Sequence, residues 1–186
     1  MILLVAGSGI LGYVASQYWY MYRTQRVLEH EWERQAAARS HVAADAPVLT
    51  RISIPKINLE AIVLEGASPE QLAAGPGHIT DTALPGQAGN AVITGHRDTF
   101  FRRIFELETG DEVLIARGSL VFRYQVTGKK VVKPDDVSVL GPTSDAQLTL
   151  ITCYPIHYIG PAPKRLVVSS RLVATDPSTS PASLLQ

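Results

Sequence analysis

Residues 149–165, TLITCYPIHYIGPAPKR, join two apolar segments through a loop rich in proline, glycine and aromatic side chains, and include the only cysteine of the chain. Apolar and β-branched residues at 147–152 and 165–173 predict two strands. A hairpin between these strands would bring Arg165 beside Cys153. The pairing predicts a thiol and a guanidinium group side by side where the first strand runs into the loop, a common place for functional residues.

Cys153 allows two interpretations. Most lone cysteines are small buried hydrophobic residues, whereas a nucleophilic cysteine needs a base or a cation that favours the thiolate. His96 ends the segment NAVITGH just as Cys153 ends QLTLITC, so the imidazole and the thiol meet if the two strands lie side by side. Arg165 could stabilise the thiolate, hold a carbonyl or donate to an oxyanion. The alternatives are a histidine that only hydrogen-bonds a carbonyl and an arginine on an exposed strand edge.

Four other histidines compete with His96 for the role of base. His157 lies in the loop just after the cysteine, and His78 lies in the segment GPGHI. His30 and His41 fall in a polar segment near the N-terminus and are expected to be solvated. His96 is the leading base because it alone ends an apolar strand in the same way as the cysteine does.

The composition excludes several classes of protein. The 186 residues are 46% apolar and 18% charged, which allows a buried core. Lys+Arg and Asp+Glu both number 17, so the formal net charge is zero and no nucleic-acid partner is expected. A single cysteine excludes an intramolecular disulfide and any zinc site that needs two thiolates.

Residues 1–22 contain no charged side chain and are long enough to cross a bilayer as a helix. Tyrosine and tryptophan side chains at 18–22, followed by Arg23 and Arg26, are typical of a membrane–water interface. We therefore predict a transmembrane anchor, with a signal peptide or a buried core helix as alternatives. A G-x-G-x-x-G pattern at 7–12 has no strand before it, so no dinucleotide cofactor is predicted.

Three regions follow the predicted anchor. Residues 23–47 are polar and alanine-rich, and apolar side chains at helical spacing predict a juxtamembrane stalk. Residues 48–173 contain short β-rich runs, which predict a barrel or a sandwich with short helices at 68–74 and 99–105. The tail 174–186 is rich in Ser, Thr and Pro and is expected to be disordered. The predicted strands are 48–54, 59–65, 90–95, 111–117, 119–127, 147–152 and 165–173, with 131–133 as an addition or extension.

Taken together, these motifs resemble the sortases, a family of bacterial cysteine transpeptidases. The resemblance rests on T-L-x-T-C at 149–153, on Arg165 at the start of the following strand, and on His96 at the end of ITGH. The segments GHRDTFFRRI and CYPIHYIGPAPKRLVV are similar to the form found in class D sortases. The resemblance covers about residues 48–173 and implies an all-β fold, an eight-stranded closed barrel.

The resemblance also implies a reaction and roles for individual residues. Cys153 would attack the Thr–Gly or Thr–Ala bond of an LPxTG-like sorting signal and form a thioester, which an amine would then resolve. His96 would protonate the leaving amine and deprotonate the incoming one, and Arg165 would hold the threonyl carbonyl. The backbone N–H of Tyr154 is a candidate oxyanion donor, and Thr152 is expected to orient substrate.

Partners and location follow from the same resemblance. The expected partners are proteins with a C-terminal sorting signal and an amine acceptor, either a cell-wall precursor or a pilin lysine. The catalytic domain would lie outside the cytoplasm, tethered to the cell membrane by a single-pass helix.

Asp98 could orient His96 or merely stabilise a turn. The acidic residues at 106–111 and 135–136 are expected to be solvated, so neither a metal nor a cofactor is predicted. A cysteine hydrolase and a catalytically silent binding module remain as alternatives.

Overall fold

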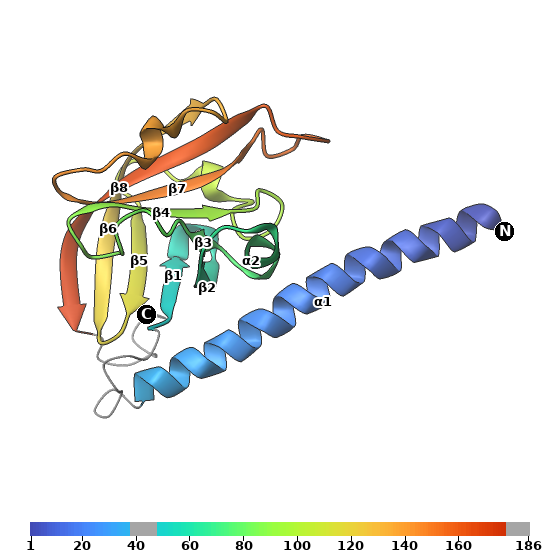
Figure 1. Ribbon diagram of the computed structural model, residues 1–186, viewed down its shortest axis with the longest axis horizontal. Coiled ribbons are helices and arrows are strands. Elements are labelled where there is room, and N and C mark those ends of the chain that lie inside the picture. Colours follow the sequence, from blue (N-terminus) through green and yellow to red (C-terminus); the bar gives the residue numbers. More distant parts are fainter. Residues whose placement is uncertain (38–47, 178–186) are drawn as a thin grey trace.

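A closed β-barrel and one long helix make up the molecule (Figure 1). The computed structural model describes residues 1–37 and 48–177. Within these residues eight strands close the barrel in the order β1-β2-β3-β4-β7-β8-β6-β5. The strands are β1 (Thr50–Ile54), β2 (Leu59–Glu65), β3 (Gly77–His78), β4 (Gly89–Gly95), β5 (Glu112–Arg117), β6 (Leu120–Val132), β7 (Ala146–Tyr154) and β8 (Lys164–Pro177). The predicted all-β fold and closed eight-stranded barrel are confirmed.

Three strands differ from the prediction. β3 is only two residues long and was missed, because so short a strand has no alternation to detect. β6 runs through both 119–127 and 131–133 as one strand, with a shift of register between Val126 and Gly128. β8 continues to Pro177, which pairs with Leu120 of β6. The first four residues of the tail predicted to be disordered are therefore strand, and 178–186 lie outside the described residues.

Of the two short helices predicted from the sequence, one is present and the other is not. The helix predicted at 68–74 is confirmed as α2 (Pro69–Ala74), which begins with a capping box. The Ser68 hydroxyl accepts from the backbone N–H of Gln71, and the Gln71 side chain accepts from the backbone N–H of Ser68. The helix predicted at 99–105 is wrong, since turns there lead only into one turn of 3-10 helix, η2 (Ile104–Glu106).

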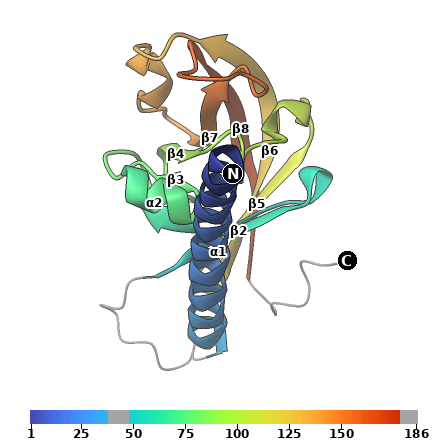
Figure 2. The same cartoon turned by 90° about the vertical axis from the view of Figure 1, so that its right-hand side faces the viewer.

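The first helix, α1 (Ile2–Ala37), runs without a break past the side of the barrel (Figure 2). The Gln25 amide donates to the carbonyl oxygens of Ile62 (3.1 Å) and Ala74 (3.0 Å). It also accepts from the backbone N–H of Ile62 at 2.8 Å. One side chain thus ties the helix to β2 and to the end of α2.

A second contact fixes the C-terminal part of α1. Trp32 is buried and packs in an apolar cluster with residues of β2, β5 and β6. The guanidinium group of Arg51 lies 5.1 Å from the Trp32 ring centroid and 3.1 Å from a Glu29 carboxylate oxygen. The segment predicted as a stalk is helical as far as residue 37, but it packs on the domain, and 38–47 lie outside the described residues.

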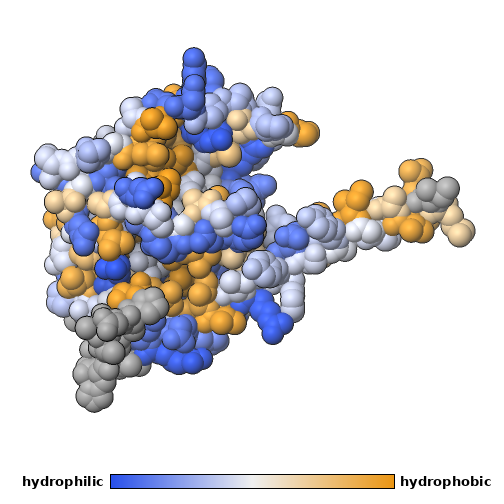
Figure 3. Space-filling model, viewed as in Figure 1, coloured by the Kyte–Doolittle hydropathy of each residue, from blue (hydrophilic) through white to orange (hydrophobic). Residues whose placement is uncertain are grey.

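The N-terminal part of α1 projects beyond the barrel, and apolar surface gathers at its free end (Figure 3). Leu3, Ile10 and Leu11 are largely exposed there. Among the described residues, no helix combines the length and the apolarity that crossing a membrane requires. The single-pass span predicted for 1–22 is therefore not confirmed.

Candidate active site

The register of β7 and β8 places Cys153 directly opposite Arg165. In an antiparallel pair, side chains that face each other lie on the same side of the sheet, with Cβ atoms about 4.5–5.5 Å apart. The hairpin pairing predicted from the sequence is confirmed, and it puts the thiol and the guanidinium group on one face.

Strand β4 brings His96 to the same end of the barrel. β4 runs parallel to β7, and the last pair in their register is Gly95 with Thr152. His96 and Cys153 are the residues that follow this pair along the sequence. The Thr152 hydroxyl donates to the Gly95 carbonyl oxygen at 2.7 Å, in a buried position. This hydrogen bond joins the two strands at the residues that precede His96 and Cys153.

Alternation along the three strands separates core side chains from reactive ones. The side chains that point into the barrel belong to its main core, among them Ile93, Leu150 and Leu166. The intervening side chains form a separate outer cluster of Val92, Ile151 and Val167. Because side chains alternate with a period of two along a strand, Cys153 of β7 and Arg165 of β8 continue this outer series. His96 is the first residue after β4 and lies at the same end of the sheet.

An apolar strip leads up to these three residues. It consists of the outer cluster, which is buried beneath side chains from the end of β6 and from the β3–β4 and β6–β7 connections. The covering residues are Ile79, Val132, Val139 and Leu140. The end of the strip is open, since His96 is exposed while Cys153 and Arg165 are half-buried. The apolar surface that a bound chain could still cover belongs to the covering residues, which are only half-buried.

Arg165 already uses part of its hydrogen-bonding capacity. Its Nη1 group donates to the carbonyl oxygens of Ala162 (3.2 Å) and Lys164 (3.0 Å). A guanidinium group has five N–H donors, so the Nε and Nη2 donors have no acceptor within the described residues. The side chain is held by its own loop while it keeps a free edge for a carbonyl oxygen or an anion.

The sortase domain family matches residues 52–173, most of the barrel. The chain belongs to the sortase family. Sortase D of Bacillus subtilis (strain 168) is 40% identical over 123 residues, which cover 66% of this chain and 62% of that protein. The chain thus spans less than two thirds of that relative's length.

Solved structures of other sortases share the fold. A sortase D5 transpeptidase from Clostridium perfringens has a TM-score of 0.67 and 26% sequence identity, over 83% of this chain and 99% of that one. A pilus-related sortase C of Group B Streptococcus has a TM-score of 0.63 and 31% identity, over 74% and 72%. The resemblance to class D seen in the sequence agrees with the first of these structures.

Thr152 of this sortase is buried beside the site. Its side chain is only 1% exposed and points into the barrel with Leu148 and Leu150. Its hydroxyl proton is donated to Gly95. This geometry fits a residue that holds β4 against β7, and the orienting role toward substrate stays a prediction.

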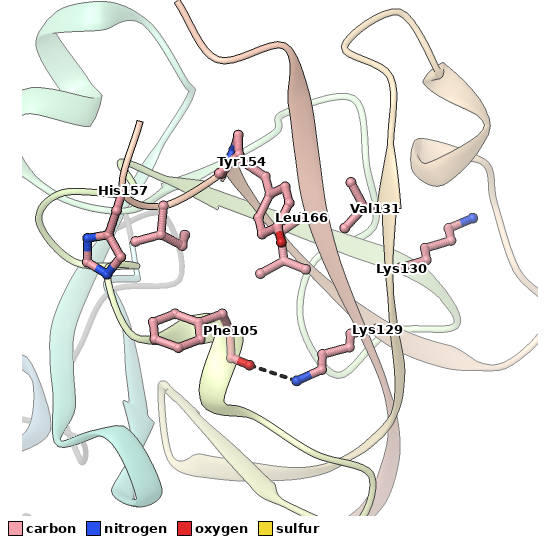
Figure 4. Close-up of a pocket in the computed structure, with 9 residues that line it drawn as sticks. Phe105, Lys129, Lys130, Val131, Tyr154, His157 and Leu166 are labelled. Carbon is pink, nitrogen blue, oxygen red and sulfur yellow. Dashed lines mark hydrogen bonds between the residues drawn. The ribbon is translucent and has the colours of Figure 1, made fainter. Parts of the chain in front are cut away.

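Tyr154 also turns away from the reactive face. Its ring packs against the main core and lines a cavity of about 510 Å³ at the mouth of the barrel, together with Phe105 and Leu166 (Figure 4). The Lys129 ammonium donates to the Phe105 carbonyl oxygen at 2.7 Å in the wall of this cavity. The backbone N–H of Tyr154 as an oxyanion donor stays a prediction.

The competing histidines are placed elsewhere. His78 is buried, with Nδ1 2.9 Å from a Glu65 carboxylate oxygen and Nε2 2.9 Å from the Ala83 carbonyl oxygen. Both ring nitrogens thus have partners within the fold. His157 is exposed and lines the cavity of Figure 4. His30 is exposed on α1, 3.5 Å from Glu33, and His41 lies outside the described residues.

Arg97, which follows His96, is a contact residue that sequence reasoning missed. Its guanidinium group donates to the carbonyl oxygens of Pro155 (3.2 Å), Tyr158 (2.9 Å) and Gly160 (2.9 Å). All three acceptors belong to the β7–β8 loop, residues 155–163. Only its position beside the leading base pointed to it, because the partners come from a loop about sixty residues away.

The acidic loop residues serve mostly in ion pairs. Arg103 donates two hydrogen bonds of 2.7 Å to Glu106 and lowers the pKa of that carboxyl. Lys56 contacts Glu108 and Asp111 at 3.1 and 2.8 Å. Within the described residues no group of three or more His, Cys, Asp or Glu side chains could hold a metal ion.

Asp98 shares a cavity with His96 rather than a hydrogen bond. The two residues line a hollow of about 270 Å³ whose opposite wall comes from Tyr18 and Met21 of α1. Within the described residues, no hydrogen bond joins the Asp98 carboxylate to the imidazole. Asp98 as an orienting group therefore stays a prediction, and α1 passes close to the leading base.

Proposed function

We propose that this sortase is a cysteine transpeptidase that cleaves an LPxTG-like sorting signal after threonine and transfers the acyl group to an amine. The observation that carries the proposal is the convergence of His96, Cys153 and Arg165. Cys153 and Arg165 are opposite each other on β7 and β8, and His96 follows β4 at the same end of the sheet. Membership of the sortase family supplies the reaction class.

The first half of the reaction forms a thioester. The Cys153 thiolate attacks the threonyl carbonyl carbon, and the carbonyl oxygen becomes an oxyanion within reach of the free Nε and Nη2 donors of Arg165. The C–N bond to the next residue then breaks. Protonated His96 gives its proton to the leaving amine, and the threonyl group stays on sulfur as the acyl-enzyme.

The second half transfers the acyl group. A neutral amine attacks the thioester carbonyl carbon, and neutral His96 takes the proton that the amine loses. The C–S bond breaks, the new amide bond forms, and Cys153 leaves as the thiolate. The thiolate and the imidazolium that started the cycle are thus restored without any further reactant.

The apolar strip fits the recognition of the signal. The leucine and proline of an LPxTG-like segment can bury apolar surface against the half-buried Val139 and Leu140, which lie beside the outer cluster. A segment that lies there in extended form reaches Cys153 with its threonine, because the strip ends at the thiol. Protein substrates with such a C-terminal signal are the partners that this geometry favours.

We also propose that the N-terminal part of α1 associates with the cell membrane and holds the catalytic domain at its outer surface. Exposed aliphatic residues at its free end, followed by Tyr18, Trp19 and the cations Arg23 and Arg26, support this location. The acceptor would be an amine of the cell wall or a pilin lysine, and a pilus-related sortase C shares this fold.

A decisive experiment incubates the full chain, in detergent, with an LPxTG-type or LPxTA-type peptide and follows the intact protein mass. We expect an acyl adduct on the wild type and none on Cys153→Ala. Addition of an oligoglycine amine should convert the adduct to ligated peptide. An adduct released only by water would favour the hydrolase, and the absence of any adduct would favour a binding module.

A further inference from the structure

We propose that Arg97 is the positioning residue that holds the β7–β8 loop and thereby sets how the acyl-enzyme divides between amine and water. The inference rests on the transpeptidase function proposed above. It assigns Arg97 a role distinct from those of His96, Cys153 and Arg165, because Arg97 would act through the loop rather than on the substrate.

The contacts of Arg97 form a clamp on the β7–β8 loop. Nη1 donates to the Pro155 carbonyl oxygen, and Nη2 donates to those of Tyr158 and Gly160. The guanidinium carbon also lies 5.9 Å from the centroid of the Tyr158 ring. A planar fork of donors can reach three carbonyl groups of one loop, whereas a lysine ammonium offers only one point of contact.

Few other interactions hold this loop. In the part of the chain that the structure describes, residues 155–163 make no backbone–backbone hydrogen bond. Their remaining hydrogen bond is the one that Arg165 makes to Ala162. Residues 157–161 are exposed, and the Ile159 side chain at the tip is fully so. Within the described residues, two arginines make all four hydrogen bonds to the loop, and Arg97 makes three of them.

Hydrogen bonds join the segments of His96 and Cys153 on both sides of these two residues. Thr152 bonds Gly95 just before the thiol and the imidazole, and Arg97 bonds Pro155 just after them. Each hydrogen bond links the segment that carries His96 to the segment that carries Cys153. Without the Arg97 hydrogen bond, the two segments are joined only before the reactive residues, so the loop that begins at Pro155 can move.

This placement gives Arg97 a kinetic signature. Aminolysis needs an amine held in line with the thioester, whereas hydrolysis needs only water, which is present everywhere at the surface. A loosened loop would therefore slow the reaction with the amine more than the reaction with water. Misplacement of a reacting group by about 1 Å can cost up to about a hundredfold in rate, so a fall of about tenfold in the ratio of ligated to hydrolysed product is expected.

The test compares Arg97→Gln and Arg97→Lys with the control Arg102→Gln in the full chain. Arg102 is an exposed arginine of the same connection, and its side chain makes no hydrogen bond within the described residues. Two readouts are needed. One is the ¹⁵N relaxation order parameter of the Ile159 and Gly160 amides, and the other is the ligated-to-hydrolysed ratio at a fixed concentration of oligoglycine.

Both Arg97 variants should lower the order parameters from about 0.85 towards 0.6 and reduce the ratio about tenfold, with adduct formation on Cys153 retained. Arg102→Gln should match the wild type. An unchanged ratio with a mobile loop would overturn the positioning role, and unchanged order parameters or a fully active Arg97→Lys would overturn the clamp. If the wild type forms no adduct, the proposed function fails instead, which the mass of the intact protein shows directly.

Discussion

The two faces of the β4–β7–β8 sheet are built from the same strands but have opposite roles. The inner face packs Ile93, Leu150 and Leu166 into the barrel core. The outer face ends in Cys153 and Arg165, with His96 at the same end of the sheet, and these residues contribute little to the core. The comparison shows that alternation assigns stability to one set of residues and chemistry to the next set along the same chain. Substitutions one residue apart should therefore separate loss of folding from loss of activity.

The largest effect is expected from Cys153→Ala on the outer face. Turnover of a sorting-signal peptide should fall by about 10⁴-fold or more, because Cys153 is the proposed nucleophile and the chain has no second cysteine. The urea midpoint should stay close to that of the wild type, since a half-buried thiol at a strand end adds little packing. Peptide turnover and urea unfolding measured on the same sample test both statements, and turnover near the wild-type rate would contradict the nucleophile.

His96→Ala is expected to reduce turnover by about 10²–10⁴-fold while the peptide still binds. The reason is that the imidazole moves a proton in both halves of the proposed reaction, and an exposed side chain contributes little to the fold. Peptide affinity can be measured by fluorescence anisotropy in a Cys153→Ala background. His157→Ala is the matched control and should keep its activity, so an inactive His157 variant would show that the base was misassigned.

Leu150→Ala tests the inner face, three residues before the nucleophile. The side chain is fully buried in the main core, so truncation should lower the free energy of unfolding by about 2–5 kcal/mol. Activity per folded molecule should stay close to the wild type. Val137→Ala removes an exposed aliphatic side chain and should change stability by about 0.5 kcal/mol at most. A Leu150 variant that keeps its stability but loses activity would break the division between the two faces.

Thr152→Val probes the one polar side chain that the inner face carries beside the site. The variant leaves the Gly95 carbonyl without its hydrogen bond and should cost about 1–2 kcal/mol of stability. If Thr152 positions β4 against β7, kcat falls by about tenfold while the KM for the peptide is unchanged. Thr152→Ser should then restore both stability and rate. A rise in KM alone would support the direct substrate contact expected from the sequence.

Much of this arrangement could be predicted because it depends on local pattern. Alternation in QLTLITC and the hairpin to Arg165 define the register that the structure has. The same alternation places Thr152 on one face with Leu148 and Leu150, so its inward position is also implicit in the sequence. The docking of α1 could not be predicted, because the partners of Gln25 and Trp32 lie far away along the chain. The contacts of Arg97 were hidden for the same reason, since they depend on the path of a loop.

The smallest effect is expected from a charge that belongs to neither face. The pKa of Glu106 is lowered by its hydrogen bonds to Arg103, so its carboxylate stabilises the fold above the pKa of an unfolded-chain glutamate, about 4.3. That contribution is lost as the pH falls through the lower pKa of the folded protein. Glu106→Gln should therefore lower the urea midpoint slightly at pH 7, with a smaller difference near pH 3.

Asp135→Asn is the control. It removes a loop carboxylate that makes no side-chain hydrogen bond within the described residues, and it should change the midpoint at neither pH. A difference for Glu106→Gln that is the same at both pH values would show that the side chain acts through packing instead of charge.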